Sequence, residues 1–269
     1  MSKSNPIAVA WTLIVVAALT PAIAQEDEAP DTVFDVVISN GRVIDPETQL
    51  DDTRNVGIKD GLIASISEEP LSGEREIDAT GHIVSPGFID THNHGAATAH
   101  GGKLSLREGV TTGMDLEAGS MNIADWYAER KGKWQLNYGT TVAQEFARAI
   151  VLDGIEQKSV RDMRDFFPTR ARSGEDGENS WSTHISTVDE MNQILGMLDQ
   201  GLVEGALGIG SLVGYASTGI TSREMYETQK VAANYGRMTA VHVRYLETAP
   251  PKENAIAGDE VLSAFCTKP

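Results

Sequence analysis

The stretch Ser85-Pro86-Gly87-Phe88-Ile89-Asp90-Thr91-His92-Asn93-His94-Gly95 decides how the rest of the sequence is interpreted. Its apolar part predicts a strand over Gly87–Thr91, closed by His92 and His94. Because side chains alternate along an extended chain, the two imidazoles are expected to point the same way, while Asn93 points away. Two imidazoles side by side at the carboxyl end of a strand can hold a borderline metal such as zinc. The alternative is a pair of polar strand-end histidines that face solvent.

Downstream of this stretch, strand-like and helix-like segments alternate, which predicts a parallel sheet covered by helices. The expected strands are 87–91, 111–117, 135–142, 205–212 and 238–245. The expected helices are 121–131, 159–167, 188–204 and 222–235. Pro168 is expected to end the second of these helices, because proline lacks a backbone N–H. Residues 172–182 are polar and contain glycine, so a surface loop is expected there.

Upstream of Pro86, the sequence predicts a small antiparallel β module over residues 33–85. Short β-rich segments are separated by turn signals at Asn40-Gly41, Asp45-Pro46 and Asp60-Gly61. The expected strands of this module are 34–38, 42–44, 55–58 and 62–66.

The first 24 residues resemble a secretory signal peptide. One lysine precedes an apolar run, Ile7–Leu19, which is short for a membrane span, and Ala22-Ile23-Ala24 supplies the small residues of a cleavage site. We expect cleavage after Ala24, a linker over residues 25–32, and a secreted or periplasmic protein. The alternative is an uncleaved N-terminal anchor.

Composition narrows the class of partner. The 269 residues carry a formal net charge of −17, which argues against nucleic acid or an anionic membrane as the main partner. A single cysteine, Cys266, excludes an internal disulfide framework and a cysteine-based zinc finger.

Taken together, Pro-Gly-Phe-Ile-Asp-Thr-His-Asn-His and the preceding Asn-Gly-Arg-Val-Ile-Asp resemble the amidohydrolase superfamily. Three further segments, 108–112, 205–210 and 241–244, are similar to its D-aminoacylase branch, the N-acyl-D-amino-acid deacylases. The resemblance implies an α/β fold: a (β/α)₈ TIM-type barrel over residues 86–269, preceded by a small β-sandwich module. It also implies a metal-dependent hydrolase of amide bonds, with one or two Zn²⁺ ions or another divalent metal.

Two more metal ligands are proposed beside His92 and His94. His242 ends an apolar strand, where barrel active sites lie, and the resemblance implies a ligand there. Glu117 ends the segment Thr111–Glu117, where D-aminoacylases place a cysteine nearby, and a carboxylate also binds zinc. We therefore predict that Glu117 bridges the metal site. The alternatives are a structural histidine and a strand-end glutamate paired with a basic side chain.

Lower-ranked residues complete the predicted site. Arg244, two residues past His242, is expected to clamp a substrate carboxylate. Tyr215 is expected to donate to a developing oxyanion. Asp90 is expected to hydrogen-bond one of the histidine ligands. Dihydroorotases and hydantoinases use a carbamylated lysine after the fourth strand, and the segment Gly205–Ser217 contains no lysine.

The barrel is expected to be partial. Eight βα units need about 250 residues, and only five strands can be placed after Pro86. The resemblance implies a further histidine ligand and a catalytic aspartate after later strands of the barrel. No residue of this chain matches either of them. We therefore expect a truncated or frameshifted chain without independent activity.

Three functions remain open from the sequence. The first is deacylation of N-acyl-D-amino acids, small-molecule substrates, by the intact protein. The second is another metal-dependent amidase, such as an isoaspartyl or D-aminoacyl peptidase. The third is a non-catalytic secreted binding protein, in which a homo-oligomer completes the sheet.

Overall fold

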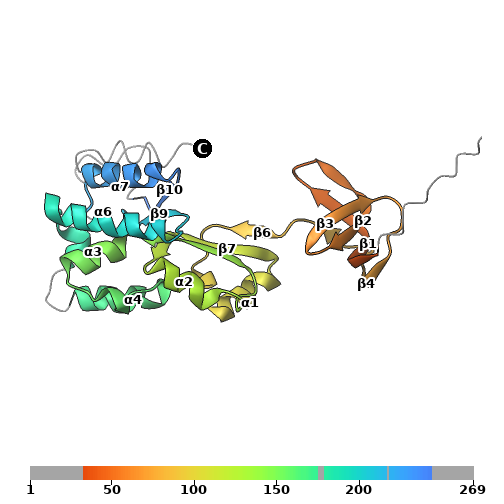
Figure 1. Ribbon diagram of the computed structural model, residues 1–269, viewed down its shortest axis with the longest axis horizontal. Helices are drawn as coiled ribbons and strands as arrows, with labels where there is room; N and C mark the ends of the chain where they lie inside the picture. Colours follow the sequence, from red (N-terminus) through yellow and green to blue (C-terminus); the bar gives the residue numbers. More distant parts are fainter. Residues whose placement is uncertain (1–32, 175–178, 217, 244–269) are drawn as a thin grey trace, which may run out of the picture. The chain divides into compact units, whose positions relative to one another are not determined.

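A computed structural model describes residues 33–174, 179–216 and 218–243. The chain divides into two compact units, with the boundary between Pro86 and Gly87 (Figure 1). No helix within the described residues is long and apolar enough to cross a membrane. The predicted signal peptide and linker lie outside the described residues.

The first unit is a single five-stranded sheet of mixed direction. Its strands are β1 (Phe34–Asp45), β2 (Leu50–Lys59), β3 (Leu62–Ser67), β4 (Gly73–Asp78) and β5 (Ile83–Val84). The order is β3-β2-β1-β4, and β5 also pairs with β1. The described residues contribute one sheet here, so the second layer of the expected sandwich is not observed among them.

The antiparallel prediction for this module holds for β1, β2 and β3 only. The tight turn at Asp60 and Gly61, both with positive φ, joins β2 to β3 as predicted. Strands β4 and β5 run parallel to β1 and were not predicted. Asn40-Gly41 was wrongly interpreted as a turn between two strands. It is a bulge inside the single strand β1, where the register shifts between Ile38 and Gly41.

The second unit is built on a five-stranded parallel sheet. The strands are β6 (Phe88–Asp90), β7 (Val110–Ser120), β8 (Asn137–Ala143), β9 (Gly208–Ser211) and β10 (Met238–Val241). Their order in space, β10-β9-β8-β7-β6, is their order in the chain. Each crossover therefore adds its strand on the same side of the sheet, as in a (β/α)₈ barrel. The prediction of a partial barrel with five strands is confirmed.

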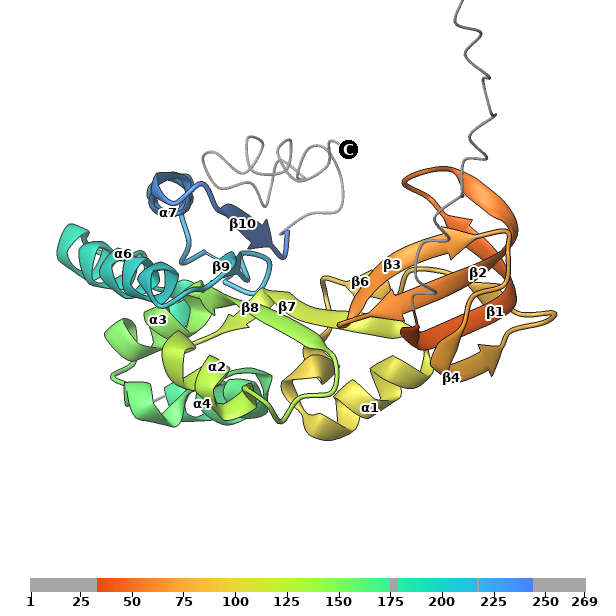
Figure 2. The ribbon, with the colours of Figure 1, turned by 45° about the vertical axis from the view of Figure 1, so that its right-hand side comes forward.

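Helices connect these strands. The α-helices are α1 (Ala99–Arg107), α2 (Ile123–Arg130), α3 (Gln144–Leu152), α4 (Met163–Ser173), α5 (Ser180–Thr183), α6 (Val188–Val203) and α7 (Ser222–Asn234). Two short 3₁₀ helices are η1 (His94–Ala97) and η2 (Gln157–Ser159). Helices α2, α3, α4 and α6 lie together on one side of β7, β8 and β9 (Figure 2). Helices α1 and α3 were not predicted.

The main core lies between the sheet and α3 and α6. Val142 of β8 and Ile209 of β9 meet Phe146 of α3 and Ile194 and Leu198 of α6, all fully buried. Burial of each such side chain contributes roughly 1.5–3 kcal/mol. This packing fixes the carboxyl ends of β7, β8 and β9, the edge at which barrel sites form.

Pro168 does not end a helix, contrary to the prediction. It lies inside α4, which runs to Ser173. Tertiary contacts on both sides of the proline outweigh the one hydrogen bond it removes. The Phe166 side chain is buried in the main core, and Arg170 forms an ion pair with Glu145.

Candidate metal centre

Both histidines of the deciding stretch lie past the strand rather than in it. Strand β6 ends at Asp90, and His94 opens η1. The segment between them remains against β7, because Asn93 N–H donates to the Met114 carbonyl (2.9 Å) and Leu116 N–H to the Thr91 carbonyl (3.2 Å). This tether holds the two imidazoles at the carboxyl end of the sheet.

Glu117 is placed by a bulge in β7. Residues 116–119 lie opposite Thr141 alone, because Asp115 pairs with Thr140 and Ser120 with Val142 of β8. Gly119 provides the left-handed backbone, with φ of +74°, that the bulge requires. Asp115 Oδ1 accepts from the Ala118 N–H at 3.1 Å and fixes the start of the bulge.

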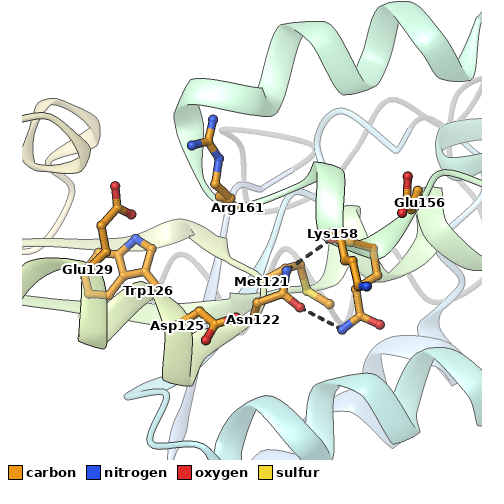
Figure 3. Close-up of a pocket in the computed structure, with 9 residues that line it drawn as sticks. Met121, Asn122, Asp125, Trp126, Glu129, Glu156, Lys158 and Arg161 are labelled. Carbon is orange, nitrogen blue, oxygen red and sulfur yellow. Dashed lines mark hydrogen bonds between the residues drawn. The ribbon is translucent and has the colours of Figure 1, made fainter.

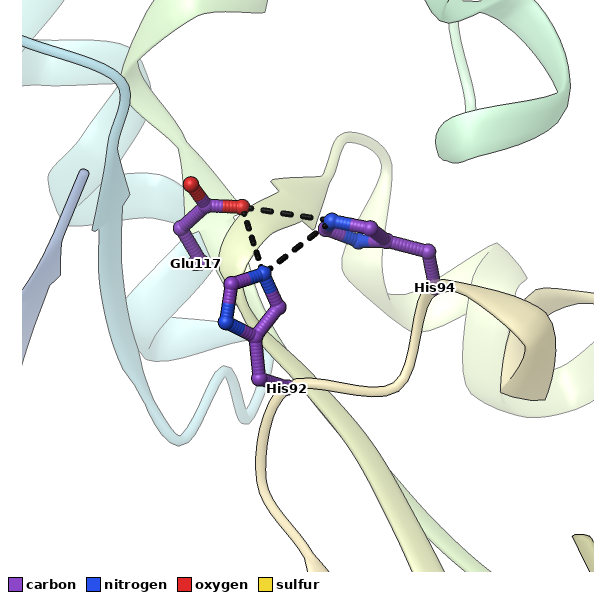
Figure 4. A group of neighbouring side chains, drawn as sticks. All are labelled: His92, His94 and Glu117. Atoms are coloured by element: carbon purple, nitrogen blue, oxygen red, sulfur yellow. Dashed lines mark hydrogen bonds and ion pairs between the residues drawn. The ribbon is translucent and has the colours of Figure 1, made fainter. Parts of the chain in front are cut away.

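The two histidines and Glu117 converge on one point (Figure 4). His92 Nε2 lies 3.2 Å from His94 Nε2. Glu117 Oε2 lies 3.1 Å from His92 Nε2 and 3.3 Å from His94 Nε2. Ligands about 2.0–2.1 Å from a tetrahedral zinc lie about 3.3 Å from one another. The three atoms therefore have the spacing and the chemistry of a zinc ligand set.

His242 approaches the other oxygen of the same carboxylate. It follows β10, and its N–H donates to the Ser211 carbonyl at 2.8 Å, which holds it beside β9. Its Nδ1 forms a short hydrogen bond with Glu117 Oε1. The carboxylate of Glu117 thus lies between the His92–His94 pair and His242, as a bridging ligand would. The four predicted ligands are brought together, and their role in metal binding remains a prediction.

Asp115 orients His94, a role that the sequence analysis did not assign. Its Oδ2 lies 3.0 Å from His94 Nδ1. A carboxylate only accepts, so Nδ1 carries a proton, and Nε2, which faces the convergence point, is the nitrogen that would bind a metal after it loses its own proton. The signal in the sequence was the alternation that puts Asp115 and Glu117 on one face. Asp90, the expected partner, instead accepts from the His92 backbone N–H at 3.1 Å.

The cluster is electrostatically suited to a cation. Asp115 first, and Glu117 second, raise the pKa of His94 to about 10. Burial opposes ionisation of Glu117, whose side chain is 11% exposed, but His94 and His242 outweigh it and hold its pKa below the ordinary value. Two carboxylates thus favour positive charge at the point where three imidazoles meet.

Of the two predicted substrate-binding residues, the structure describes only Tyr215. The ring of Tyr215 stacks against that of His242, with centroids 4.3 Å apart and planes tilted by 31°. Tyr215 is 46% exposed, so it lies at the solvent-accessible edge of the cluster. Arg244 lies outside the described residues. Of the histidines outside the cluster, His100 lies in α1, and His184 Nε2 lies 3.0 Å from Glu190 Oε2 at the start of α6.

A separate open pocket lies between α2 and the segment 156–161 (Figure 3). It shares no residue with the histidine cluster. Met121 N–H donates to the Arg161 carbonyl at 2.7 Å, and Gln157 Nε2 donates to Asn122 Oδ1 at 3.0 Å. These bonds tie the end of β7 to the segment before α4, so we interpret its polar groups as structural.

No family model matches the chain. Among curated proteins, a dihydroorotase of Streptococcus pyogenes is 28% identical over 239 residues, which cover 80% of this chain and 55% of the relative. A dihydroorotase of Solibacter usitatus is 52% identical over 60 residues, covering 22% of this chain and 14% of the relative.

Among solved structures, the N-acyl-D-glutamate deacylase of Bordetella bronchiseptica, complexed with zinc and a phosphonate inhibitor, aligns with a TM-score of 0.61. The identity is 21%, over 80% of this chain and 46% of that chain. A D-aminoacylase aligns with a TM-score of 0.60 and 22% identity, over 79% and 46% of the two chains. The resemblance to the amidohydrolase superfamily is confirmed.

The chain spans about half the length of the Streptococcus pyogenes relative and of these solved structures. The two curated relatives named above are dihydroorotases, and the two solved structures named above are deacylases.

Proposed function

We propose that the intact protein is a zinc-dependent hydrolase that removes the acyl group from N-acyl-D-amino acids. His92, His94 and Glu117 would hold the metal, with His242 on the second oxygen of Glu117. The observation that carries this proposal is the triangle of ligand atoms, with edges of 3.1–3.3 Å. No residue of this chain is assigned the role of general base.

The residues around the triangle supply orientation. When bound, zinc supplies a water of lowered pKa and polarises a carbonyl. Asp115 fixes the tautomer and the ring plane of His94 through their 3.0 Å contact. Glu117, within the bulge in β7, contacts His92 and His94 through Oε2 and His242 through Oε1. Tyr215, whose ring stacks on that of His242, would donate to an oxygen that gains negative charge.

The choice of substrate rests on two observations. The deacylase folds align over about four-fifths of this chain with TM-scores of 0.60 and 0.61. In addition, β9 and the residues that follow it to Ala216 contain no lysine, so the carbamylated lysine implied for dihydroorotases has no counterpart there.

A second candidate is hydrolysis of a cyclic amide. The curated relatives favour it, since a dihydroorotase shares 28% identity over most of this chain. It would use the same metal ligands, and only the substrate distinguishes it. The isoaspartyl or D-aminoacyl peptidase alternative shares the ligands as well, and no observation favours it over deacylation.

The test begins with metal. The purified chain is stripped with a chelator and titrated with zinc, and His92→Ala is compared with a matched control, His100→Ala, an exposed histidine of α1. Zinc binding should be lost in the first variant and unchanged in the second. Equal binding by the two variants would reject the assigned site.

Substrate class is tested by calorimetry, which measures ligand binding to the zinc-loaded chain. We expect binding of N-acetyl-D-amino acids, weaker binding of their L enantiomers, and no binding of dihydroorotate. Preferred binding of dihydroorotate would replace the first candidate by the second.

Export is proposed on the sequence alone. We propose that residues 1–24 direct the chain to the periplasm or outside the cell and are removed after Ala24. N-terminal sequencing of the protein from a periplasmic fraction should begin at Gln25, and an intact Met1 in that fraction would contradict removal of the signal.

A further inference from the structure

A second group of polar and aromatic side chains borders the histidine cluster. At its centre is Arg170 of α4. Its guanidinium carbon lies 3.8 Å from the centroid of the Phe166 ring, 4.7 Å from that of Tyr215 and 4.8 Å from that of Trp181. We call Arg170, Glu145, Trp181 and Tyr215 the Arg170 group.

Tyr215 connects the Arg170 group to the candidate metal centre. The Arg170 guanidinium lies over the Tyr215 ring, and the centroid of the His242 ring lies 4.3 Å from that of Tyr215. Distances of 4.7 Å and 4.3 Å place the guanidinium carbon no more than about 9 Å from the centre of the His242 ring. A substrate with its amide at the metal centre would have its other polar groups within reach of Arg170.

Arg170 retains a free pair of donors. Its Nε and Nη2 donate to Glu145 Oε1 and Oε2 at 2.8 and 2.9 Å. A guanidinium has five N–H donors, so three remain, two on Nη1 and one on Nη2. No acceptor for these is found among the residues that the structure describes. One N–H from each Nη forms the end-on fork that matches a carboxylate.

Glu145 makes this geometry rigid. It follows β8 and is 3% exposed, so its bidentate contact fixes the guanidinium plane. The Arg170 side chain is 23% exposed, so part of it is open to solvent. An arginine fixed on one edge and accessible elsewhere loses little entropy when it binds a planar anion.

A second donor in the same group also lacks an acceptor. Trp181 is 5% exposed, and its Nε1 is buried without a hydrogen-bond partner in the described part of the chain. A buried unpaired N–H costs about 1–3 kcal/mol. Such a group in a native structure calls for an explanation, and a ligand that supplies the acceptor is one.

From these observations we infer that Arg170 and Trp181 form a subsite for a carboxylate of the substrate. This inference rests on the proposed function, which places the scissile amide at the metal centre. It assigns to Arg170 the clamp that the sequence analysis assigned to Arg244. Glu145 acts as a positioning residue. The carboxylate is either the α-carboxylate of an N-acyl amino acid or an acidic side chain.

The experiment is a cycle of ligands and variants, read by calorimetry on the zinc-loaded chain. N-acetyl-D-alanine carries only an α-carboxylate. The 1-amide of N-acetyl-D-glutamate carries only a side-chain carboxylate. N-acetyl-D-alaninamide carries neither. The wild-type chain should bind one of the two acids more tightly than the amide by about tenfold to a hundredfold, the range of a charge-assisted hydrogen bond.

The variants assign that preference to the two donors. Arg170→Gln should abolish the preference for the acid and leave amide binding unchanged. Trp181→Phe should reduce it about twofold to tenfold, as expected for a neutral donor. Arg161→Gln is the matched control, because it also removes an arginine that pairs with a carboxylate, here Asp165, and it should change nothing.

Loss of Glu145's partner could unfold the Arg170→Gln variant, so Arg170→Lys is measured as well. A lysine keeps the charge and the contact with Glu145 but cannot present an end-on fork, so most of the preference should be lost. Equal binding of acids and amide by the wild-type chain would overturn the inference, as would an unchanged preference in Arg170→Lys and Trp181→Phe.

Failure of the proposed function gives a different result. A chain that does not bind zinc but still prefers the acid, in an Arg170-dependent way, contradicts the metal centre alone. A chain that binds zinc at His92 and His94 but shows no preference contradicts the carboxylate subsite alone.

Discussion

The Asp115 carboxylate holds the His94 imidazole from the side opposite the convergence point, with Oδ2 3.0 Å from Nδ1. The other nitrogen, Nε2, lies 3.3 Å from Glu117 Oε2. A single strand, β7, therefore supplies both the carboxylate that orients the histidine and the carboxylate that meets it as a ligand. A bulge follows Asp115 in β7 and contains Glu117.

Replacing Asp115 should weaken zinc binding without removing a ligand. Asp115→Asn leaves the volume unchanged but removes the charge that fixes the His94 tautomer, and such partners are worth about tenfold to a hundredfold in metal affinity. Competition with a chromophoric chelator measures the change. Asp125→Asn, an exposed aspartate of α2, is the control and should bind zinc like the wild type. An Asp115→Asn chain with wild-type affinity would remove Asp115 from the site.

The bulge itself can be tested at Gly119. An added methyl group would lie 2.7 Å from Thr141 Oγ1 and 2.9 Å from the Thr141 carbonyl oxygen, at φ of +74°. Gly119→Ala should therefore displace Glu117 and weaken zinc binding. Gly132→Ala provides the matched control, since φ is +71° there and the space is open.

The two glycine variants should also differ in stability. Gly132→Ala should lower the free energy of unfolding by about 1–2 kcal/mol, because an alanine is strained in the left-handed backbone conformation. Gly119→Ala should lower the free energy of unfolding by about 1–3 kcal/mol more than Gly132→Ala does, because the added methyl group also overlaps with Thr141. Urea denaturation followed by circular dichroism measures both. Equal losses in the two variants, with zinc binding intact in both, would show that the bulge does not position Glu117.

Glu117 should be replaceable by a different zinc ligand but not by its own amide. Glu117→Gln keeps the shape and loses the negative charge, so zinc binding should fall by more than about tenfold. Glu117→Cys introduces a thiolate, which binds zinc well, and should retain a measurable site. Zinc content after gel filtration distinguishes the two. Full occupancy in Glu117→Gln would show that the histidines bind without this carboxylate.

A buried ion pair supports the wall beneath the Arg170 group. Arg148 Nη1 lies 2.6 Å from Glu224 Oε2, and both side chains are almost fully buried. Arg148 also donates to the carbonyls of Trp181 and His184. Glu224→Ala should destabilise the chain by about 3–5 kcal/mol, because it leaves a buried charge without a partner.

The control for that pair is an exposed one on the same helix. Glu227 pairs with Lys230 at 2.8 Å, with both side chains accessible. Glu227→Ala should lower the free energy of unfolding by less than about 1 kcal/mol in the same denaturation experiment. A similar cost for both substitutions would mean that the Arg148–Glu224 pair is solvated in solution.

The parallel sheet and the convergence of the four proposed ligands were within reach of the sequence because both depend on local patterns. The five apolar segments after Pro86 each became a strand, and polar residues at their carboxyl ends came together because parallel strands end at one edge. His242 and Glu117, 125 residues apart, meet for that reason.

Features that depend on tertiary contacts were not predictable in the same way. The local sequence does not indicate whether Asn40 lies in a bulge or in a turn, because both structures accept a residue with positive φ. The helix through Pro168 depends on Arg170 reaching Glu145 across the fold. Asp115 could be placed on the face of Glu117 but not against His94, because that contact requires the tether between Asn93 and Met114.

The central claim is that two histidines and a carboxylate bind zinc at the end of β6 and β7. X-ray absorption at the zinc edge of the loaded chain tests it most directly. The account predicts nitrogen and oxygen ligands at about 2.0–2.1 Å with imidazole scattering and no sulfur, and loss of the imidazole signal in His92→Ala. A sulfur shell near about 2.3 Å, or an unchanged spectrum in His92→Ala, would contradict it.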